Sequence, residues 1–179
     1  TITNTASGQD ITFADGQTVD ATSIVTTNTP YDMDFIGSST TVTNATTFAH
    51  TGTLTLGNAD ADALTFNGGL AHTAGATSLQ GSLATSNDTI QVAALTFAGS
   101  STITTDTGAG NIQIEGNLNA TVATDILTLG AGTGTIDYQG AIPTMVPAYL
   151  AITSGGGISN GAAATVNLSN VNLVLNANG

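Results

Sequence analysis

Short runs in which apolar and polar residues alternate recur along the chain. Four of them have the form apolar-x-apolar-x-Gly and occupy residues 64–68, 95–99, 112–116 and 136–140. A period of two places the apolar side chains on one face of a strand, and the closing glycine marks a turn. No window shows the i, i+3, i+4, i+7 apolar pattern of an amphipathic helix. The sequence therefore predicts an all-β chain.

The spacing of the runs indicates how the strands are arranged. The four runs start 31, 17 and 24 residues apart, and the triplet Ala-His-Thr recurs at residues 49–51 and 71–73, which is a spacing of 22. Irregular periods near 20–25 residues are typical of β-solenoid coils, whereas propeller blades need about 40 or more. Dividing 179 residues by about 22 predicts about eight coils, with inward residues forming a continuous narrow core.

The composition fits a narrow core. The chain has no Trp, five Phe and three Tyr, but 22 Gly, which suit the corners of coils. Thr, which alternates with the apolar residues, suits outward strand positions. A β-sandwich of immunoglobulin type is the alternative, although it would need larger aromatic residues and less repetition. We expect a single solenoid domain over residues 1–179.

The charge excludes several classes of function. The chain has no Lys, Arg or Cys, and its 12 Asp plus Glu give a formal net charge of -12. Without cations, it has nothing to neutralise nucleic-acid phosphates or to attract an anionic membrane. A Walker-type phosphate loop, an amine for Schiff-base chemistry, a disulfide and a thiolate site are excluded too. Because the longest apolar run, residues 92–95, is too short to span a membrane, no insertion is expected.

Residues 53–153 resemble the repeats of filamentous-haemagglutinin-like proteins, which are large secreted bacterial surface adhesins. The likeness is carried by LTFNG (64–68), AGATSLQG (74–81), TDTGAGNI (105–112), LTLGAGTGTI (127–136) and LAIT (150–153). The resemblance implies a right-handed parallel β-helix, an extracellular or cell-surface location, and adhesive or structural work without catalysis. A cell-surface or carbohydrate ligand is a separate expectation for its partner. A chain without Lys or Arg is itself more typical of an exported protein.

Two histidines are the only candidate bases. If a coil has about 22 residues, His50 and His72 occupy equivalent positions in neighbouring coils and could share a metal ion. The simpler hypothesis is that both face solvent on successive rungs. No nucleophile-elbow spacing accompanies them, and a sugar-cleaving site would need aromatic platforms and cations that the chain lacks. We therefore predict that the protein is not an enzyme and needs no organic cofactor.

Two pairs of acids are candidate calcium ligands. Asp32 and Asp34, and likewise Asp60 and Asp62, are two residues apart, which places both carboxylates of a pair on one side of a strand or turn. Unpaired carboxylates in loops suit Ca²⁺. Neither pair matches an EF-hand or the Gly-rich calcium repeat, so plain solvated acids are the competing interpretation. A calcium-dependent ligand-binding module is the alternative function.

The ends of the chain suggest self-association. A solenoid needs polar caps over its terminal coils, yet Thr1–Thr3 reads as a strand and residues 164–175 alternate or run apolar. The chain is thus predicted to be either a segment of a longer solenoid or a filament subunit that pairs end to end. Thr-x-Thr pairs, as at Thr102 and Thr104, could order water as in ice-binding proteins, but they lack one fixed spacing.

Overall fold

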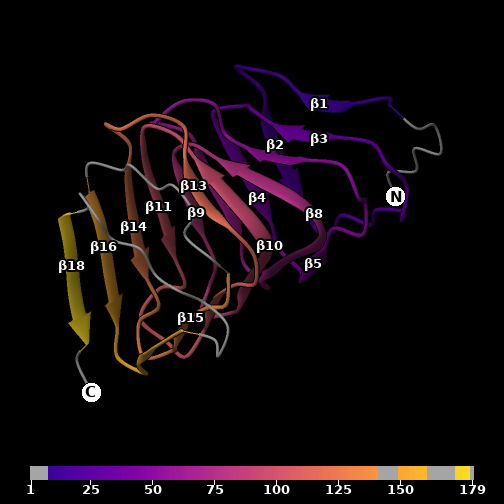
Figure 1. Ribbon diagram of the computed structural model, residues 1–179. Coiled ribbons are helices and arrows are strands. Elements are labelled where there is room, and N and C mark those ends of the chain that lie inside the picture. Colours follow the sequence, from indigo (N-terminus) through magenta and orange to yellow (C-terminus); the bar gives the residue numbers. More distant parts are fainter. Residues whose placement is uncertain (1–7, 141–148, 161–171, 178–179) are drawn as a thin grey trace.

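The strands stack in chain order along one axis. A computed structural model describes residues 8–140, 149–160 and 172–177. These residues form eighteen strands and no helix. Every strand pair between them is parallel. Figure 1 shows the N-terminal strands in indigo at one end of the stack and the C-terminal strands in yellow at the other. The all-β parallel solenoid is confirmed. The β-sandwich alternative is wrong, because sandwich sheets are antiparallel.

The strands belong to two sheets. Sheet A has ten strands, and the main path through it runs β1 (Ile11–Phe13), β3 (Met33–Phe35), β6 (Leu54–Leu56), β8 (Leu70–Leu79), β10 (Ile90–Phe97), β12 (Ile112–Ile114), β15 (Ile136–Tyr138) and β17 (Ile158–Asn160). Two short strands join this path, β5 (Thr46–Thr47) at β8 and β13 (Leu118–Ala120) at β10. Sheet B has eight strands, β2 (Thr18–Ala21), β4 (Ser39–Val42), β7 (Ala63–Phe66), β9 (Ser82–Ala84), β11 (Ser100–Thr104), β14 (Ile126–Gly130), β16 (Tyr149–Ser154) and β18 (Asn172–Ala177).

Sheet A bends into two arms, so each turn of the solenoid has three faces. The start of β10 pairs with β12, whereas its end pairs with β13, and the register shifts between Val92 and Ala94. We call the part that contains β12 and β15 the first arm, and the part that contains β3, β6 and β13 the second arm. The solenoid has about six turns, so the expected eight coils differ only slightly from the structure.

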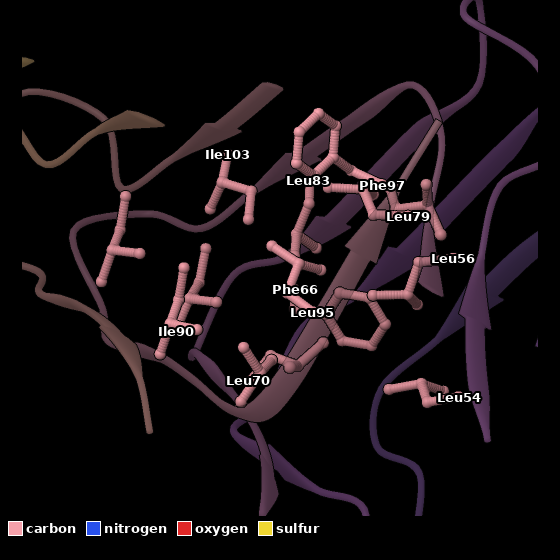
Figure 2. Packing of buried hydrophobic residues seen from close by; sticks show 14 of the residues in the cluster. Leu54, Leu56, Phe66, Leu70, Leu79, Leu83, Ile90, Leu95, Phe97 and Ile103 are labelled. Atoms are coloured by element: carbon pink, nitrogen blue, oxygen red, sulfur yellow. The ribbon is translucent and has the colours of Figure 1, made fainter. Parts of the chain in front are cut away.

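Alternation along the strands fills the interior with one continuous core. In β3, β6, β12 and β15 the first and third residues are buried while the middle one is half-buried, as a period of two requires. Figure 2 shows side chains from successive turns, including Leu56, Leu79 and Phe97, packed against one another. Phe66 contacts Phe35 and Phe48 edge to face, with ring centroids 6.2 and 5.8 Å apart. Truncation of a buried aromatic of this kind typically costs about 3–5 kcal/mol.

Several hydroxyl side chains point inward rather than outward. Ser101, Thr105 and Ser154 are buried. Their hydroxyl groups donate hydrogen bonds to the carbonyl oxygens of Ala98, Gly110 and Gly157, respectively, at 2.7–2.8 Å. Each acceptor lies three to five residues away along the chain, in the same corner. A buried carbonyl without a donor would be costly. These residues therefore satisfy the corner backbone, a role that the expected outward placement of Thr did not include.

The sequence repeats do not all mark equivalent positions. Of the four apolar-x-apolar-x-Gly runs, only those at Ile112 and Ile136 lie in register, one turn apart on the first arm. Leu64 lies in sheet B, and Leu95 lies on the second arm. Each turn contributes three short strands with similar alternation, so a run on one face resembles a run on another. The spacings of 31 and 17 residues therefore separate runs that lie on different faces of the solenoid.

Candidate functional site

Asp62 closes a corner between sheet A and sheet B. Its carboxylate is almost fully buried, and Oδ2 accepts hydrogen bonds from the backbone N–H groups of Asn58 and Ala59 at 2.8 and 3.0 Å. Backbone N–H groups carry partial positive charge, so they occupy the direction from which a cation would have to approach. A calcium ion bound to this oxygen would have to displace the two hydrogen bonds that form the turn.

Asp60 makes contacts along the axis of the stack. Its Oδ1 accepts hydrogen bonds from the Gln80 side-chain amide at 2.9 Å and from the Ser100 backbone N–H at 3.2 Å. Asp60 therefore links corners of successive turns. Asp60 and Asp62 therefore accept hydrogen bonds from different donors. Asp62 binds the backbone of its own turn, whereas Asp60 binds groups of the following turns.

Asp32 and Asp34 also lie beside hydrogen-bond donors. Asp32 Oδ1 accepts the backbone N–H of Thr53 in the next turn at 2.6 Å, and Asp34 Oδ2 accepts the hydroxyl of Thr12 in the preceding turn at 3.1 Å. Asp34 lies on the outer face of β3, whereas Asp32 precedes this strand. Among the residues that the structure describes, no group of three or more His, Asp or Glu side chains converges in a way that could hold a metal ion.

Asp125 performs the same role as Asp62 at another corner, and sequence reasoning missed it. Its Oδ2 accepts the N–H groups of Thr121 and Val122, each at 2.8 Å, and Oδ1 accepts the N–H of Gly99 at 2.9 Å. Burial acts to raise the pKa of Asp125, but these N–H groups and the Thr121 hydroxyl lower it overall. Asp62 and Asp125 share a sequence signal. Each directly precedes a strand of sheet B and accepts the backbone N–H of the residue three positions earlier in the chain.

Three rings form a buried stack at the bend that precedes the second arm. His50 stacks on Tyr31 with ring centroids 5.1 Å apart and on His72 with centroids 4.7 Å apart, and both interplanar angles are 21°. The expected stacking of the two histidines in neighbouring turns is observed. The solvent-facing placement is wrong, because both histidines are 0% exposed. Each histidine lies two residues after a buried apolar residue, Phe48 or Leu70, so the period of two directs both rings into the core.

The two imidazoles have unequal hydrogen bonding. His72 Nδ1 lies 3.0 Å from the Thr77 hydroxyl, and its Nε2 lies 3.2 Å from the carbonyl oxygen of His50. Neither ring nitrogen of His50 has a hydrogen-bond partner. Burial lowers the pKa of His50, although the Thr53 backbone and the Asp32 charge act in the opposite direction. Burial and the neighbouring His50 lower the pKa of His72 to about 4.

Replacing His50 by phenylalanine is expected to stabilise the protein at pH 7 by about 1 kcal/mol, because a buried polar group without a partner is costly and an aromatic ring of similar shape keeps the stack. Chemical denaturation measures the effect. The matched control is His72→Phe, which removes two satisfied contacts and is expected to destabilise the protein. Equal destabilisation by both substitutions would contradict the assignment of His50 as an unsatisfied group.

The first turn leaves core side chains partly open. Ile11 and Phe13 in β1 and Val19 in β2 are only half-buried. Their register partners one turn later are covered, since Met33 and Phe35 are both 0% exposed. Phe13 stacks on Phe35 with centroids 4.8 Å apart. Within the part of the chain that the structure describes, the column of core side chains thus ends in an apolar surface at the N-terminal end of the stack.

The backbone of β1 presents an edge at the same end. Among the described residues, β1 pairs with β3 alone and β2 with β4 alone. The Ile11 N–H donates to Asp32, and the Phe13 carbonyl accepts from Ile36, so both point toward the second turn. Because successive residues of a strand point their backbone groups to opposite sides, Thr12 directs its N–H and C=O away from β3. This edge and the apolar surface beside it form the N-terminal end surface.

Comparison of the chain with protein-family models, with curated proteins and with solved structures gives no match. In the described part of the chain, no helix has the length and apolar character needed to cross a membrane.

Proposed function

We propose that the chain is a structural segment of an extracellular bacterial surface fibre or stalk, with adhesive or spacing work and no catalysis. The observation that carries the proposal is the N-terminal end surface, where the parallel ladder and the apolar core formed by the described residues both end. Such a surface is completed by one more turn of the same kind, since a parallel edge pairs with another strand and the core column continues. The solenoid supplies length and stiffness.

The charge and the sequence support the extracellular role. A chain with no Lys or Arg and a net charge of -12 resembles exported surface proteins, and the repeat segments resemble those of filamentous haemagglutinins. The uniform negative charge opposes contact between copies at low ionic strength. At physiological salt, charges that lie more than about 8 Å apart are largely screened from each other. The repulsion between copies is therefore weakened, and backbone pairing at the end surface outweighs it. End-to-end association of a surface that does not close on itself gives filaments.

A proline at Thr12 tests this association. Thr12→Pro removes the N–H that points away from β3 and leaves the hydrogen bonds of Ile11 and Phe13 to the second turn in place. We expect Thr12→Pro to abolish the axial assemblies that the unaltered chain forms at physiological salt, as measured by light scattering.

Thr12→Ala is the matched control, because it also removes the side-chain hydrogen bond to Asp34 but keeps the backbone donor. It should assemble like the unaltered chain. Circular dichroism of both variants checks that the fold is retained. If Thr12→Pro assembles as well as Thr12→Ala, pairing through β1 is not the basis of association.

A further inference from the structure

One bend of the solenoid lies outside the strands. Residues 49–53 lead from the first arm into β6 without strand structure, and we call them the His50 bend. One turn later the same bend lies within β8, whose start pairs with β5 and whose end pairs with β6. In the turn after that, it lies within β10. The regular ladder is therefore interrupted at the His50 bend, whereas β8 and β10 run through the bend as single strands.

Side chains replace part of the ladder at the His50 bend. Three hydrogen bonds join its backbone to side chains of the adjacent turns. They connect the Ala49 N–H to Thr26 Oγ1 at 2.7 Å, the Thr53 N–H to Asp32 Oδ1 at 2.6 Å, and the His50 carbonyl oxygen to His72 Nε2 at 3.2 Å. Two of these three side chains, Asp32 and His72, are titratable. The bend is thus held partly by groups whose hydrogen bonding depends on their protonation state.

His72 is bonded in its neutral form. A carbonyl oxygen only accepts hydrogen bonds, so Nε2 carries the imidazole proton and donates it to the carbonyl of His50. The other nitrogen of a neutral imidazole is an acceptor, so Nδ1 accepts the Thr77 hydroxyl at 3.0 Å. A second proton on Nδ1 would place a donor against the hydroxyl that donates to it. Both hydrogen bonds of the ring therefore match the neutral form.

The surroundings of the two imidazoles give little support to positive charge. The side chains that face the pair are Tyr31, Asp32, Thr77 and the apolar Phe48 and Val92. Asp32 is the one carboxylate among them, and it acts on His50. If both histidines were protonated, two cations would be stacked with their ring centroids 4.7 Å apart. One carboxylate cannot compensate two buried cations.

We infer that the His50 bend is an acid-operated joint, which opens when His50 and His72 take up protons while the sheets around it stay paired. Sheet B does not pass through the bend, and β4 stays paired with β7. After the bend, β6 is paired on both sides, with β3 and with β8. Opening therefore loosens one bend and leaves the axis of the solenoid intact.

The direction of the pH effect follows from the closed form. Burial and the neighbouring His50 lower the pKa of His72 to about 4 in the closed bend, and exposure to water restores its ordinary value of 6.5. The open bend therefore binds protons more tightly than the closed bend, so the open form gains population as the pH falls below 6.5. The joint belongs to a single chain and does not depend on association between copies.

Amide hydrogen exchange, followed on peptides by mass spectrometry and corrected for the intrinsic effect of pH, tests the joint. We expect the amides of residues 48–53 to exchange faster than those of β12 and β15. Low concentrations of urea should leave their exchange unchanged, because a local opening exposes little surface. Between pH 7 and pH 4.5 their protection should fall by about tenfold or more.

The matched variant combines His50→Phe with His72→Gln. A glutamine amide can still donate to the carbonyl of residue 50 and accept from Thr77, but it does not titrate. Protection at the bend should then be equal at the two pH values. In the unaltered chain, protection and urea dependence equal to those of β12 would overturn the joint, because the bend would then open only with the whole fold. Protection that does not change with pH, or an equal fall in the double variant, would also overturn it.

Discussion

Alanine at Gly57 is expected to lower the free energy of unfolding by about 3 kcal/mol. Gly57 has a φ of 74°, a backbone conformation that disfavours a side chain, and an added Cβ would collide with the carbonyl oxygen of Gln80 in the next turn. The left-handed conformation alone accounts for about 1 kcal/mol. The rest arises because the two corners must separate, which weakens the ladder on both sides. Urea denaturation measures the loss.

Gly16 is the matched control. Its φ is 73°, nearly the same as that of Gly57, but nothing lies within 4 Å of the position that a Cβ would take. Gly16→Ala should therefore lower the free energy of unfolding by only about 1 kcal/mol. If the two substitutions have the same effect, the corners of neighbouring turns are not in close contact, and the stacking distance between them is wrong.

Acidification is expected to destabilise the fold through His72 by roughly 2–3 kcal/mol. The pKa of His72 is lowered to about 4 in the folded protein, whereas the unfolded value is 6.5. Between these values the unfolded chain binds a proton that the folded chain does not, so stability is full above pH 6.5 and falls as the pH approaches 4. His50, whose pKa is also lowered, adds to the same slope.

The variant His72→Phe isolates this contribution. Relief of repulsion between carboxylates changes stability with pH in both proteins and cancels in the difference between them. Asp125 does not interfere, because its pKa lies below 3.8 and the stability that it contributes is lost only under more acidic conditions. Denaturation midpoints at pH 7 and pH 4.5 should differ less in the variant. An unchanged pH slope would show that His72 is not buried in its neutral form.

The fold could be predicted because alternation and turn residues are local signals. Runs such as 112–116 and 136–140 show both the strand and its closing glycine, and their spacing of 24 residues equals one turn. The three-faced cross-section could not be predicted, because strands on different faces have the same alternation. Only the register shows that Leu64 and Leu95 lie on different faces.

The side-chain roles were harder to predict. The 22-residue spacing correctly placed His50 and His72 in neighbouring turns. Their burial follows the same period of two as that of Phe48 and Leu70, a pattern that the solvent-facing interpretation did not use. The acid pairs were predicted to be candidate calcium ligands because carboxylates without a basic partner are typical cation ligands. The structure shows Asp62 and Asp125 accepting backbone N–H groups at corners, and this role depends on the fold of the corner rather than on the spacing between acids.

The central claim is that the N-terminal end surface accepts another turn of the solenoid. Electron microscopy of the purified chain at physiological salt tests it most directly, through the distribution of particle lengths. The account predicts unbranched rods of increasing length as the concentration rises, with Thr12→Pro restricted to particles one subunit long. Particles of the unaltered chain that stay one subunit long at every concentration would contradict it.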